Sequence, residues 1–357
     1  MNKNSQKKPP LSLFGLSPEN LVEALDLEKS FQGKQIFKWI AGGASSFNEM
    51  TNLSKSERER LSAFMPSTYS SKVINTQVDE TGATKLAIEL YDGEVIECVL
   101  LKDKDDKLSA CLSSQVGCAM GCKFCRTGTM GFHRNLASEE IIEQFAHLSK
   151  LGKITHIVYM GMGEPMANMG PVLSSIRYFH REDTYFISLR RITISTCGVV
   201  NGIRELTELD FPVKLAVSLV SADDRIRSSI MPVNDKWNLK VLRQSLLHFQ
   251  AKGGKKITLE YCMLSGVNCD ERAAERLAAF TRGMLCTVNL IPWNPAAELP
   301  WSTPSSDEIN RFCMYLEDFH INYVRRYTKG RNINGACGQL ATKVTLQEKS
   351  NMEKIEL

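Results

Sequence analysis

The sequence predicts an α/β protein in which a parallel sheet follows a small helical region. From about Ser109 to Arg331, apolar runs of strand length alternate with amphipathic helical stretches. The region before residue 66 shows helical spacing only, and the segment that joins the two regions changes to strand period. Strand–helix alternation is typical of right-handed βαβ units, whose parallel sheet is either open or curled into a barrel.

The region from Leu11 to about Met65 is predicted to be helical. Apolar residues recur there at three- and four-residue spacing in LVEALDLEKS, KQIFKWIAGG and KSERERLSAF. Either Asn52 or Ser54 is expected to cap the last helix, because Glu57 stands three positions after Ser54.

Residues 67–108 are predicted to form a linking β-hairpin. The run KLAIELYDGEVIECVLLKD contains two strand patterns around Asp92-Gly93, which is a tight-turn signal. Further strands are predicted at HIVYMGM (156–162), RITIST (191–196), VKLAVSL (213–219), KITLEYCML (256–264), TVNLIPW (287–293) and NYVRR (322–326). Helical stretches such as SEEIIEQFAHLSK and LKVLRQSLLHFQAK lie between them. Residues 1–10 are predicted to be a disordered tail, and residues 341–357 a polar C-terminal tail.

The composition favours a cytoplasmic protein without a membrane span. The chain has 357 residues, a formal net charge of +4 and 43% hydrophobic residues, a globular composition that permits nucleic-acid binding without indicating it. No window reaches the ~20 apolar residues of a membrane span, and the start MNKNSQKKPP leads into no apolar signal core. The 11 cysteines, an odd number, argue against a disulfide framework.

Three cysteines stand close together as Cys118-x3-Cys122-x2-Cys125. A closed zinc site needs four ligands, and no further His or Cys follows at zinc-finger spacing. Three thiolates on a four-iron cluster leave one iron open to a substrate's amino and carboxylate groups. Chance thiols or a zinc knuckle are the alternatives.

This spacing resembles the CxxxCxxC signature of the radical S-adenosylmethionine (SAM) superfamily, and its surroundings resemble the RlmN/Cfr family of RNA adenine methyltransferases. The residues that carry this resemblance are Phe124, Gly128, Gly131-Phe132, Arg134-Asn135-Leu136, MGMGEP at 160–165, ACGQL at 336–340 and the segments GKQIFKWI and EMTNLSK. Pro165 and IPWNP at 291–295 favour the RlmN branch. The resemblance covers nearly the whole chain. It implies an α/β radical-SAM partial (β/α)6 barrel at 109–340, an N-terminal helical accessory domain at 11–66 and the linking β-hairpin.

The resemblance also implies a mechanism. Adenine C2 and C8 are not nucleophilic toward a methyl sulfonium, so one SAM methylates a cysteine and a second yields the radical that activates the methylated cysteine. In this scheme Cys337 is the methyl carrier, Cys111 is the resolving thiol and Glu97 is the base. Cys118, Cys122 and Cys125 hold a 4Fe-4S cluster with an open iron for SAM.

The residues alone leave two of these roles open. Cys111 has the pattern of a buried strand cysteine, and Glu97 is either a buried base or a water-facing residue of an edge strand. Burial would raise the pKa of Glu97 toward the range useful for proton abstraction. The disulfide step requires the Cα atoms of Cys111 and Cys337 to approach within roughly 7 Å, which a barrel-like sheet permits.

The remaining SAM contacts are predicted where strands end, because ligand-binding loops gather at one edge of a barrel-like parallel sheet. The residues that the resemblance implies are Gly163, Glu164, Ser195, Ser218, Leu219, Val220 and Asn294. The family usually has His where this chain has Val220, so only a backbone contact is expected there.

Clustered basic residues are candidate RNA contacts, although such clusters are more often solvated surface. The strongest run leads to Cys337, where phosphate contacts would help to position the RNA. The candidates are Arg325, Arg326, Lys329 and Arg331, then Arg190-Arg191, then Lys252, Lys255 and Lys256, and Lys34, Lys38 and Trp39 near the N-terminus. Phe37 and Trp39 are otherwise expected to fill the helical region's core.

The leading hypothesis is methylation of adenine C2 in 23S rRNA, with tRNA as an open second substrate. Methylation of C8 of the same adenine, as in the Cfr branch, and a non-catalytic 4Fe-4S RNA-binding paralogue are the alternatives. The expected partners are RNA and an electron donor such as flavodoxin or ferredoxin, and the expected state is a monomer. A single-stranded or flipped base is the form accessible to such chemistry.

Overall fold

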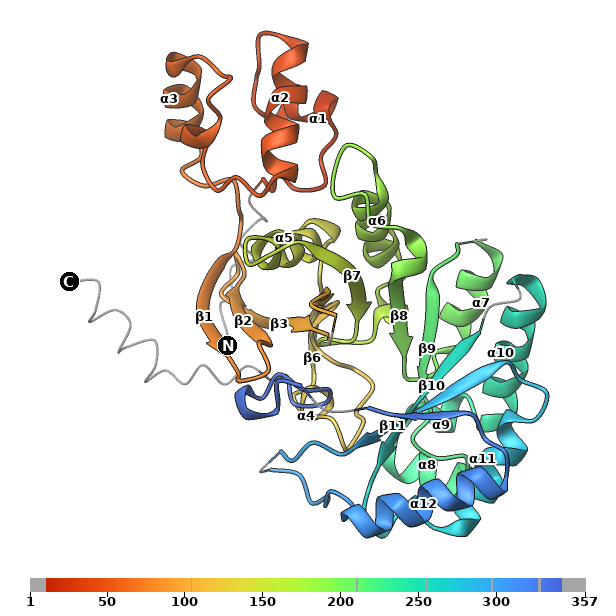
Figure 1. The fold of residues 1–357 in the computed structure, drawn as a ribbon. Coiled ribbons are helices and arrows are strands. Elements are labelled where there is room, and N and C mark those ends of the chain that lie inside the picture. Colours follow the sequence, from red (N-terminus) through yellow and green to blue (C-terminus); the bar gives the residue numbers. More distant parts are fainter. Residues whose placement is uncertain are drawn as a thin grey trace, which may run out of the picture.

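A computed structural model describes residues 11–103, 105–209, 211–253, 256–296, 298–326 and 329–341. Within these residues one ten-stranded sheet has the order β1-β2-β3-β4-β7-β8-β9-β10-β11-β12 (Figure 1). The expected tail at 1–10, all but the first residue of the tail at 341–357, and Lys255 lie outside the described residues. None of the helices in the described ranges has the length and apolar character that crossing a membrane requires.

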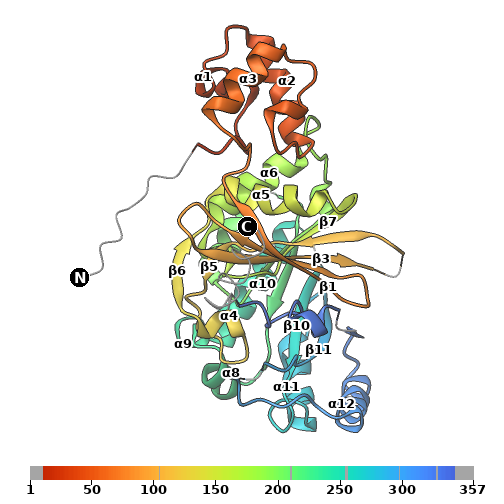
Figure 2. The same ribbon diagram turned by 90° about the vertical axis from the view of Figure 1, so that its left-hand side faces the viewer.

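The N-terminal region is helical, as predicted, and stands beside α5 and α6 at one end of the molecule (Figure 2). Its helices are α1 (Pro18–Ala24), α2 (Ser30–Ala41) and α3 (Lys55–Phe64). The stretch LVEALDLEKS is not one helix, because Asp26 adopts a left-handed backbone (φ 50°) that ends α1.

Polar contacts fix the last helix of this region. Ser54 caps α3 by accepting from the Glu57 N–H at 3.2 Å, which decides between the two predicted caps. Asn52 instead accepts from the Trp39 indole N–H at 2.8 Å. Phe37 is buried as expected, whereas Trp39 is half-buried.

The linking segment forms three antiparallel strands, β1 (Lys72–Val78), β2 (Thr84–Glu89) and β3 (Val95–Lys102). The predicted hairpin at Asp92-Gly93 joins β2 to β3, and β1 is a strand that the sequence pattern did not predict. Strand β3 pairs in turn with β4 (Leu108–Cys111), which runs parallel to β7. The hairpin is therefore continuous with the core sheet.

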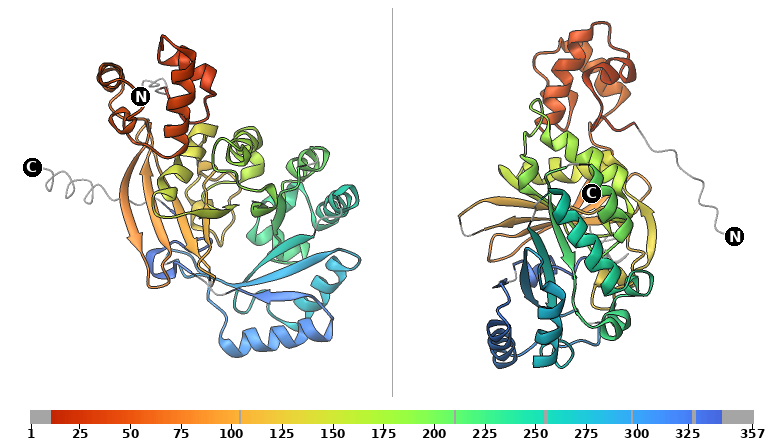
Figure 3. Two further views of the ribbon diagram at one scale, coloured as in Figure 1. Left: turned by 45° about the horizontal axis from the view of Figure 1, so that its top comes forward. Right: turned by 90° about the vertical axis from the view of Figure 1, so that its right-hand side faces the viewer.

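The core is a curved parallel sheet with helices on its outer side, and all six strands predicted there are present (Figure 3). These strands are β7 (Ile154–Tyr159), β8 (Ile192–Thr196), β9 (Lys214–Ser218), β10 (Ile257–Met263), β11 (Cys286–Pro292) and β12 (Tyr323–Arg325). The outer helices are α5 (Ser138–Ser149), α6 (Met169–His180), α7 (Val200–Glu208), α10 (Leu239–Gly253), α11 (Glu271–Thr281) and α12 (Ser306–Asp318). The chain after β12 returns to the inner side of the sheet.

Glu143 of α5 joins the helical region, the linker and the core. This buried carboxylate accepts hydrogen bonds from Ser12 Oγ at 3.0 Å and Ser70 Oγ at 2.8 Å, and from the N–H groups of Ser70 and Ser71 at 3.0 Å each. The Ser71 hydroxyl donates to it as well. Removing this acceptor would leave several buried donors without partners.

Glu143→Ala is expected to lower the free energy of unfolding by about 3 kcal/mol, because unsatisfied buried donors retain their desolvation cost. Urea denaturation followed by circular dichroism measures this change. The matched control is Glu139→Ala on the same helix, where the half-buried carboxylate accepts a hydrogen bond from its neighbour Ser138. An equal decrease in the free energy of unfolding in the two variants would contradict the role of Glu143 in joining the three regions.

Candidate active site

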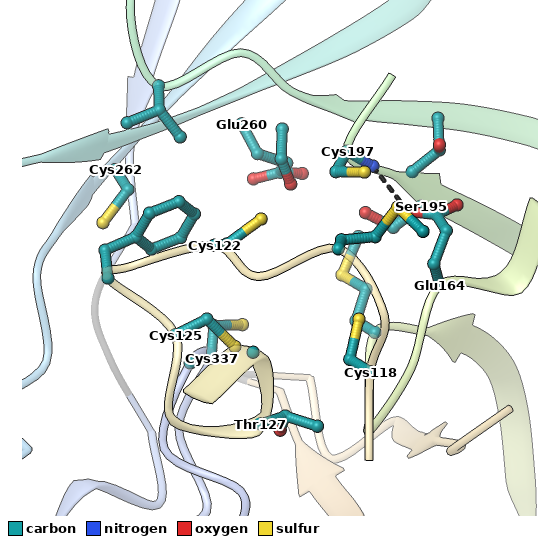
Figure 4. Close-up of a pocket in the computed structure, with 18 of the residues that line it drawn as sticks. Cys118, Cys122, Cys125, Thr127, Glu164, Ser195, Cys197, Glu260, Cys262 and Cys337 are labelled. Carbon is teal, nitrogen blue, oxygen red and sulfur yellow. Dashed lines mark hydrogen bonds between the residues drawn. The ribbon is translucent and has the colours of Figure 1, made fainter. Parts of the chain in front are cut away.

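A cavity lies inside the curved sheet, where the carboxyl ends of the parallel strands meet the loops that follow them (Figure 4). Its ionisable lining consists of thiols, carboxylates and one phenol: Cys118, Cys122, Cys125, Cys197, Cys262, Cys337, Glu164, Glu260 and Tyr159. No lysine, arginine or histidine is among the described residues that line it.

The three clustered cysteines occupy one loop that borders this cavity. The loop runs from β5 (Gln115–Gly117) to the short helix α4 (Arg126–Thr129). The Cys118 N–H donates to the Gly131 carbonyl at 2.8 Å, and the Cys125 N–H donates to the Cys122 carbonyl at 3.1 Å. Gly128 permits this packing, since a Cβ there would lie 2.7 Å from the Cys122 carbonyl oxygen.

The donor chemistry of this loop fits an iron–sulfur cluster. Burial and the neighbouring thiols raise the pKa of Cys118 to about 12, and that of Cys125 to about 11. Because these cysteines are shielded from water, their thiolate forms need cationic partners, which the irons of a cluster supply. Among the described residues, no three His, Cys, Asp or Glu side chains are arranged to hold a single metal ion.

Gly163 and Glu164 line the same cavity. Gly163 has φ 96°, and a Cβ there would lie 2.5 Å from Gln115 Cβ, so the close approach requires glycine. The buried Glu164 carboxylate accepts from the N–H groups of Met166 at 3.0 Å and Cys197 at 2.8 Å. Burial raises its pKa.

The other predicted SAM contacts divide into two groups. Ser195, Ser218, Val220 and Asn294 line the cavity. Leu219 does not line it: the residue is fully buried, and its carbonyl accepts from Arg227 Nε at 3.1 Å.

Cys337 lies between this cavity and a second one. The second cavity is lined by Cys111, Met160, Asn294, Arg326, Lys329 and Cys337, among others. Cys337 is exposed and Cys111 is buried, and both thiols are free. Burial raises the pKa of Cys111 to about 12, with a further contribution from the nearby Cys337. The fold therefore brings the two predicted thiols to one cavity although more than 200 residues separate them in sequence.

Glu97 is buried in β3, which lies between β2 and β4, so the edge-strand alternative is wrong. Its carboxylate lies 2.9 Å from Lys85 Nζ and accepts from the Ala341 N–H at 2.9 Å. Burial raises the pKa of Glu97, and Lys85 opposes the rise. Glu97 is not among the described residues that line either cavity.

Only part of the basic run before Cys337, which consists of Arg325, Arg326, Lys329 and Arg331, lies on the surface. Arg326 and Lys329 line the second cavity, and the Lys329 ammonium donates to the Lys102 carbonyl. Arg325 donates to Asn310 Oδ1 at 3.1 Å, and Arg331 is exposed. The remaining basic candidates in the described ranges are absent from both linings: Arg190, Arg191, Lys252, Lys256, Lys34, Lys38 and, with them, Trp39.

Sequence reasoning missed several cavity residues, among them two thiols and one carboxylate. Glu260 and Cys262 project from the same face of β10, and Cys197 follows β8. Glu260 is buried, one of its carboxylate oxygens has no hydrogen-bond partner among the described residues, and Arg326 approaches it at 3.8 Å. A carboxylate inside the apolar run KITLEYCML is the same signal that marks Glu97, and it would have identified Glu260.

Comparisons with known proteins agree with this geometry. The pattern described as Radical SAM superfamily matches residues 112–277, and that described as Ribosomal RNA large subunit methyltransferase N-terminal domain matches residues 12–65. The chain is 44% identical over 337 residues to a Treponema denticola protein named probable dual-specificity RNA methyltransferase RlmN, covering 94% of this chain and 97% of the relative. A Carboxydothermus hydrogenoformans protein of the same name is 42% identical over 340 residues, covering 93% of this chain and 98% of that protein.

A solved structure extends the likeness to three dimensions. The crystal structure of a radical SAM methyltransferase from Sphaerobacter thermophilus matches with a TM-score of 0.87 and 37% sequence identity. The match covers 93% of this chain and 99% of that one. The fold is therefore the radical-SAM α/β fold, as predicted, and this superfamily implies a 4Fe-4S cluster and SAM as cofactors.

Replacing Cys118, Cys122 or Cys125 singly by Ala is expected to reduce reconstituted iron to less than about a fifth of the wild-type content, because each removes one of three thiolate donors. Iron and sulfide analysis with visible absorption measures this. Cys313→Ala, a buried cysteine on α12, is the matched control and should keep its iron. A full iron content in any of the three variants would contradict that residue's assignment as a ligand.

Proposed function

The chain belongs to the RlmN family of radical SAM RNA methyltransferases, and on this premise we propose that it methylates C2 of an adenine in 23S ribosomal RNA. The observation that carries the proposal is the position of Cys337, which lines both cavities. One cavity holds the cysteine loop, and the other holds Cys111. A carrier of a one-carbon unit needs access to a donor and to an acceptor, and Cys337 has both.

The cofactors enter through the first cavity. A 4Fe-4S cluster on Cys118, Cys122 and Cys125, with SAM on its open iron, would supply the radical chemistry that an unreactive adenine carbon requires. Gly163, Ser195, Ser218 and Asn294 would hold SAM, because they line the same cavity. Val220 offers mainly its side chain, since its carbonyl already accepts from Asn268 Nδ2 at 2.7 Å.

Cys337 and Cys111 have different roles in the proposed reaction. Cys337 accepts the methyl group and presents the activated carbon to the base, which leaves the protein bound to RNA through that sulfur. Cys111 attacks the Cys337 sulfur and releases the RNA, forming a disulfide. Arg326 lines their common cavity and opposes the rise that burial imposes on the pKa of Cys111.

Glu97 is the proposed base that removes the proton from C2 of the adduct. Lys85 holds the carboxylate toward its ionised form, which a base must have. Because Glu97 contacts the Ala341 N–H and lines neither cavity, this role requires the segment that contains Ala341 to move before the carboxylate reaches RNA.

The RNA base enters through the second cavity, where Arg326 and Lys329 are suited to phosphate contacts. A base inside a helix could not reach Cys337, so the adenine must be unpaired or flipped. The relatives' name specifies dual specificity, which supports a second RNA substrate, and we assign this to tRNA.

Cys337→Ala is expected to abolish 2-methyladenosine formation, because the carrier sulfur is lost. Cys111→Ala should accumulate a covalent RNA–protein complex, because the adduct cannot be resolved. Nucleoside mass spectrometry of digested RNA and denaturing gels measure the two outcomes.

Cys286→Ala, which changes a cysteine at the start of β11 that lines neither cavity, is the control and should behave as wild type. Methyl transfer by Cys337→Ala would refute the carrier role. Formation of 8-methyladenosine by the wild type would refute the C2 assignment in favour of C8.

Lys85→Met is expected to move release of the covalent adduct to higher pH. Loss of the ammonium raises the pKa of Glu97 further above its ordinary value, so less base is ionised at a given pH. At a pH below the pKa, the ionised fraction of Glu97 falls about tenfold for each 1.36 kcal/mol by which its ionisation becomes less favourable, and release slows in proportion. Decay of the isolated adduct across pH measures this.

Lys85→Arg keeps the charge and should retain the wild-type profile. Lys107→Met removes a lysine paired with Asp105 on an exposed turn, and serves as the surface control. An unchanged pH profile in Lys85→Met would show that Lys85 does not set the ionisation of the base.

A further inference from the structure

Arg227 is a fully buried arginine without a carboxylate partner at ion-pair distance among the described residues. It belongs to α8 (Asp224–Ile230). Its guanidinium donates to the Leu219 carbonyl at 3.1 Å, to Asn234 Oδ1 at 2.9 Å and to the Cys197 carbonyl at 2.6 Å. These acceptors are neutral, so the hydrogen bonds satisfy the donors without neutralising the charge. The nearby Asp224 carboxylate forms no ion pair with Arg227 and offsets only part of the cost of burying the charge.

This charge lies directly behind the wall of the cysteine cavity. Cys197, whose carbonyl binds Arg227, lines that wall next to Cys122, as Figure 4 shows. Helix α8 also packs on the cysteine loop, because the Lys123 N–H donates to the Ile230 carbonyl at 2.9 Å. The guanidinium is close enough to the Cys122 and Cys197 side chains to interact electrostatically with them.

No cation is among the described residues that line the cavity itself, although Arg326 lies 3.8 Å from Glu260. The described lining of the cavity contains six thiols and two carboxylates, Glu164 and Glu260, and neither lysine nor arginine nor histidine. A cluster held by three thiolates is anionic, and one-electron reduction makes it more so. Charges interact more strongly in the protein interior than in water, so a buried cation next to this wall acts on the cluster with little screening.

We propose that Arg227 is the buried countercharge of the cluster site and that its charge favours the reduced cluster. This proposal rests on the iron–sulfur part of the proposed function and not on the identity of the RNA. Reduction adds one electron from an external low-potential donor, dithionite in the test below, and needs no proton and no change in bonding at Arg227.

A purely structural role is the competing explanation, because Arg227 also ties together the ends of β8 and β9. The double variant Asp224→Asn/Asn234→Asp separates the two explanations. Asn234 Nδ2 donates to Asp224 Oδ1 at 2.9 Å, so exchanging amide and carboxylate keeps this hydrogen bond and the total charge. The exchange places a carboxylate 2.9 Å from Arg227 Nη1, where an amide oxygen now stands.

The test is a dithionite titration of the reconstituted protein without RNA, with the reduced cluster quantified by electron paramagnetic resonance. The exchange variant is expected to lower the equilibrium constant for cluster reduction at least about tenfold, which is about 59 mV for one electron. Arg227→Lys keeps the charge but loses the hydrogen bonds of the guanidinium. Its equilibrium constant for cluster reduction should stay within about threefold of the wild-type value. Asp224→Asn alone, which moves no charge onto Arg227, should not lower the constant.

An unchanged equilibrium constant in the exchange variant, or the same decrease in Arg227→Lys, would overturn the proposal and leave Arg227 a structural role. Because no RNA is present, either result is independent of whether the protein methylates adenine C2.

Discussion

The site depends on two hydrogen bonds that join the C-terminal segment to the cysteine loop. The Arg126 N–H donates to the Gly338 carbonyl at 2.8 Å, and Thr127 Oγ1 donates to the Leu340 carbonyl at 2.6 Å. They hold Cys337 beside a loop that lies more than 200 residues earlier in the sequence. The curved sheet makes this contact possible, because the chain beyond β12 returns across its inner side to α4 and β3. Without it, Cys337 would not border both cavities.

Buried charge is the second organising feature, and the protein compensates it differently at each position. Glu97 has a direct ammonium partner, Lys85, and Glu143 has a set of serine donors. Glu164 is held by backbone N–H groups, which neutralise less charge. Glu260 has Arg326 at 3.8 Å, and the fully buried Arg227, which lies behind the wall of the cysteine cavity, binds carbonyls. A charge without a close partner can still interact with a bound group, whereas a charge in an ion pair is already neutralised.

The sequence predicted the parallel core well because its strands are buried and regularly spaced between amphipathic helices. Strand β1 was missed because KVINTQV is mostly exposed and polar, so no apolar period marks it. The break at Asp26 was missed because one left-handed residue interrupts a continuous helical pattern. The cysteine loop could be predicted from the spacing of its cysteines. The burial of Arg227 could not be predicted, because its segment DDRIRSSI has the composition of a solvated helix and only the tertiary structure shows that the side chain is buried.

Val220 shows how the site tolerates its departure from the family pattern. This residue has φ 60°, a left-handed backbone that is strained for a β-branched side chain and costs of order 1–3 kcal/mol. Surrounding groups impose it: the Val220 carbonyl accepts from Asn268 Nδ2 at 2.7 Å, and Asn268 also donates to the Cys262 carbonyl at 2.8 Å. Asn268 therefore holds the backbone at 220 through groups that are not part of the Val220 side chain. The valine at 220, where the family usually has histidine, changes one side chain of the cavity wall but not the path of the backbone there. This argues against a degenerate site.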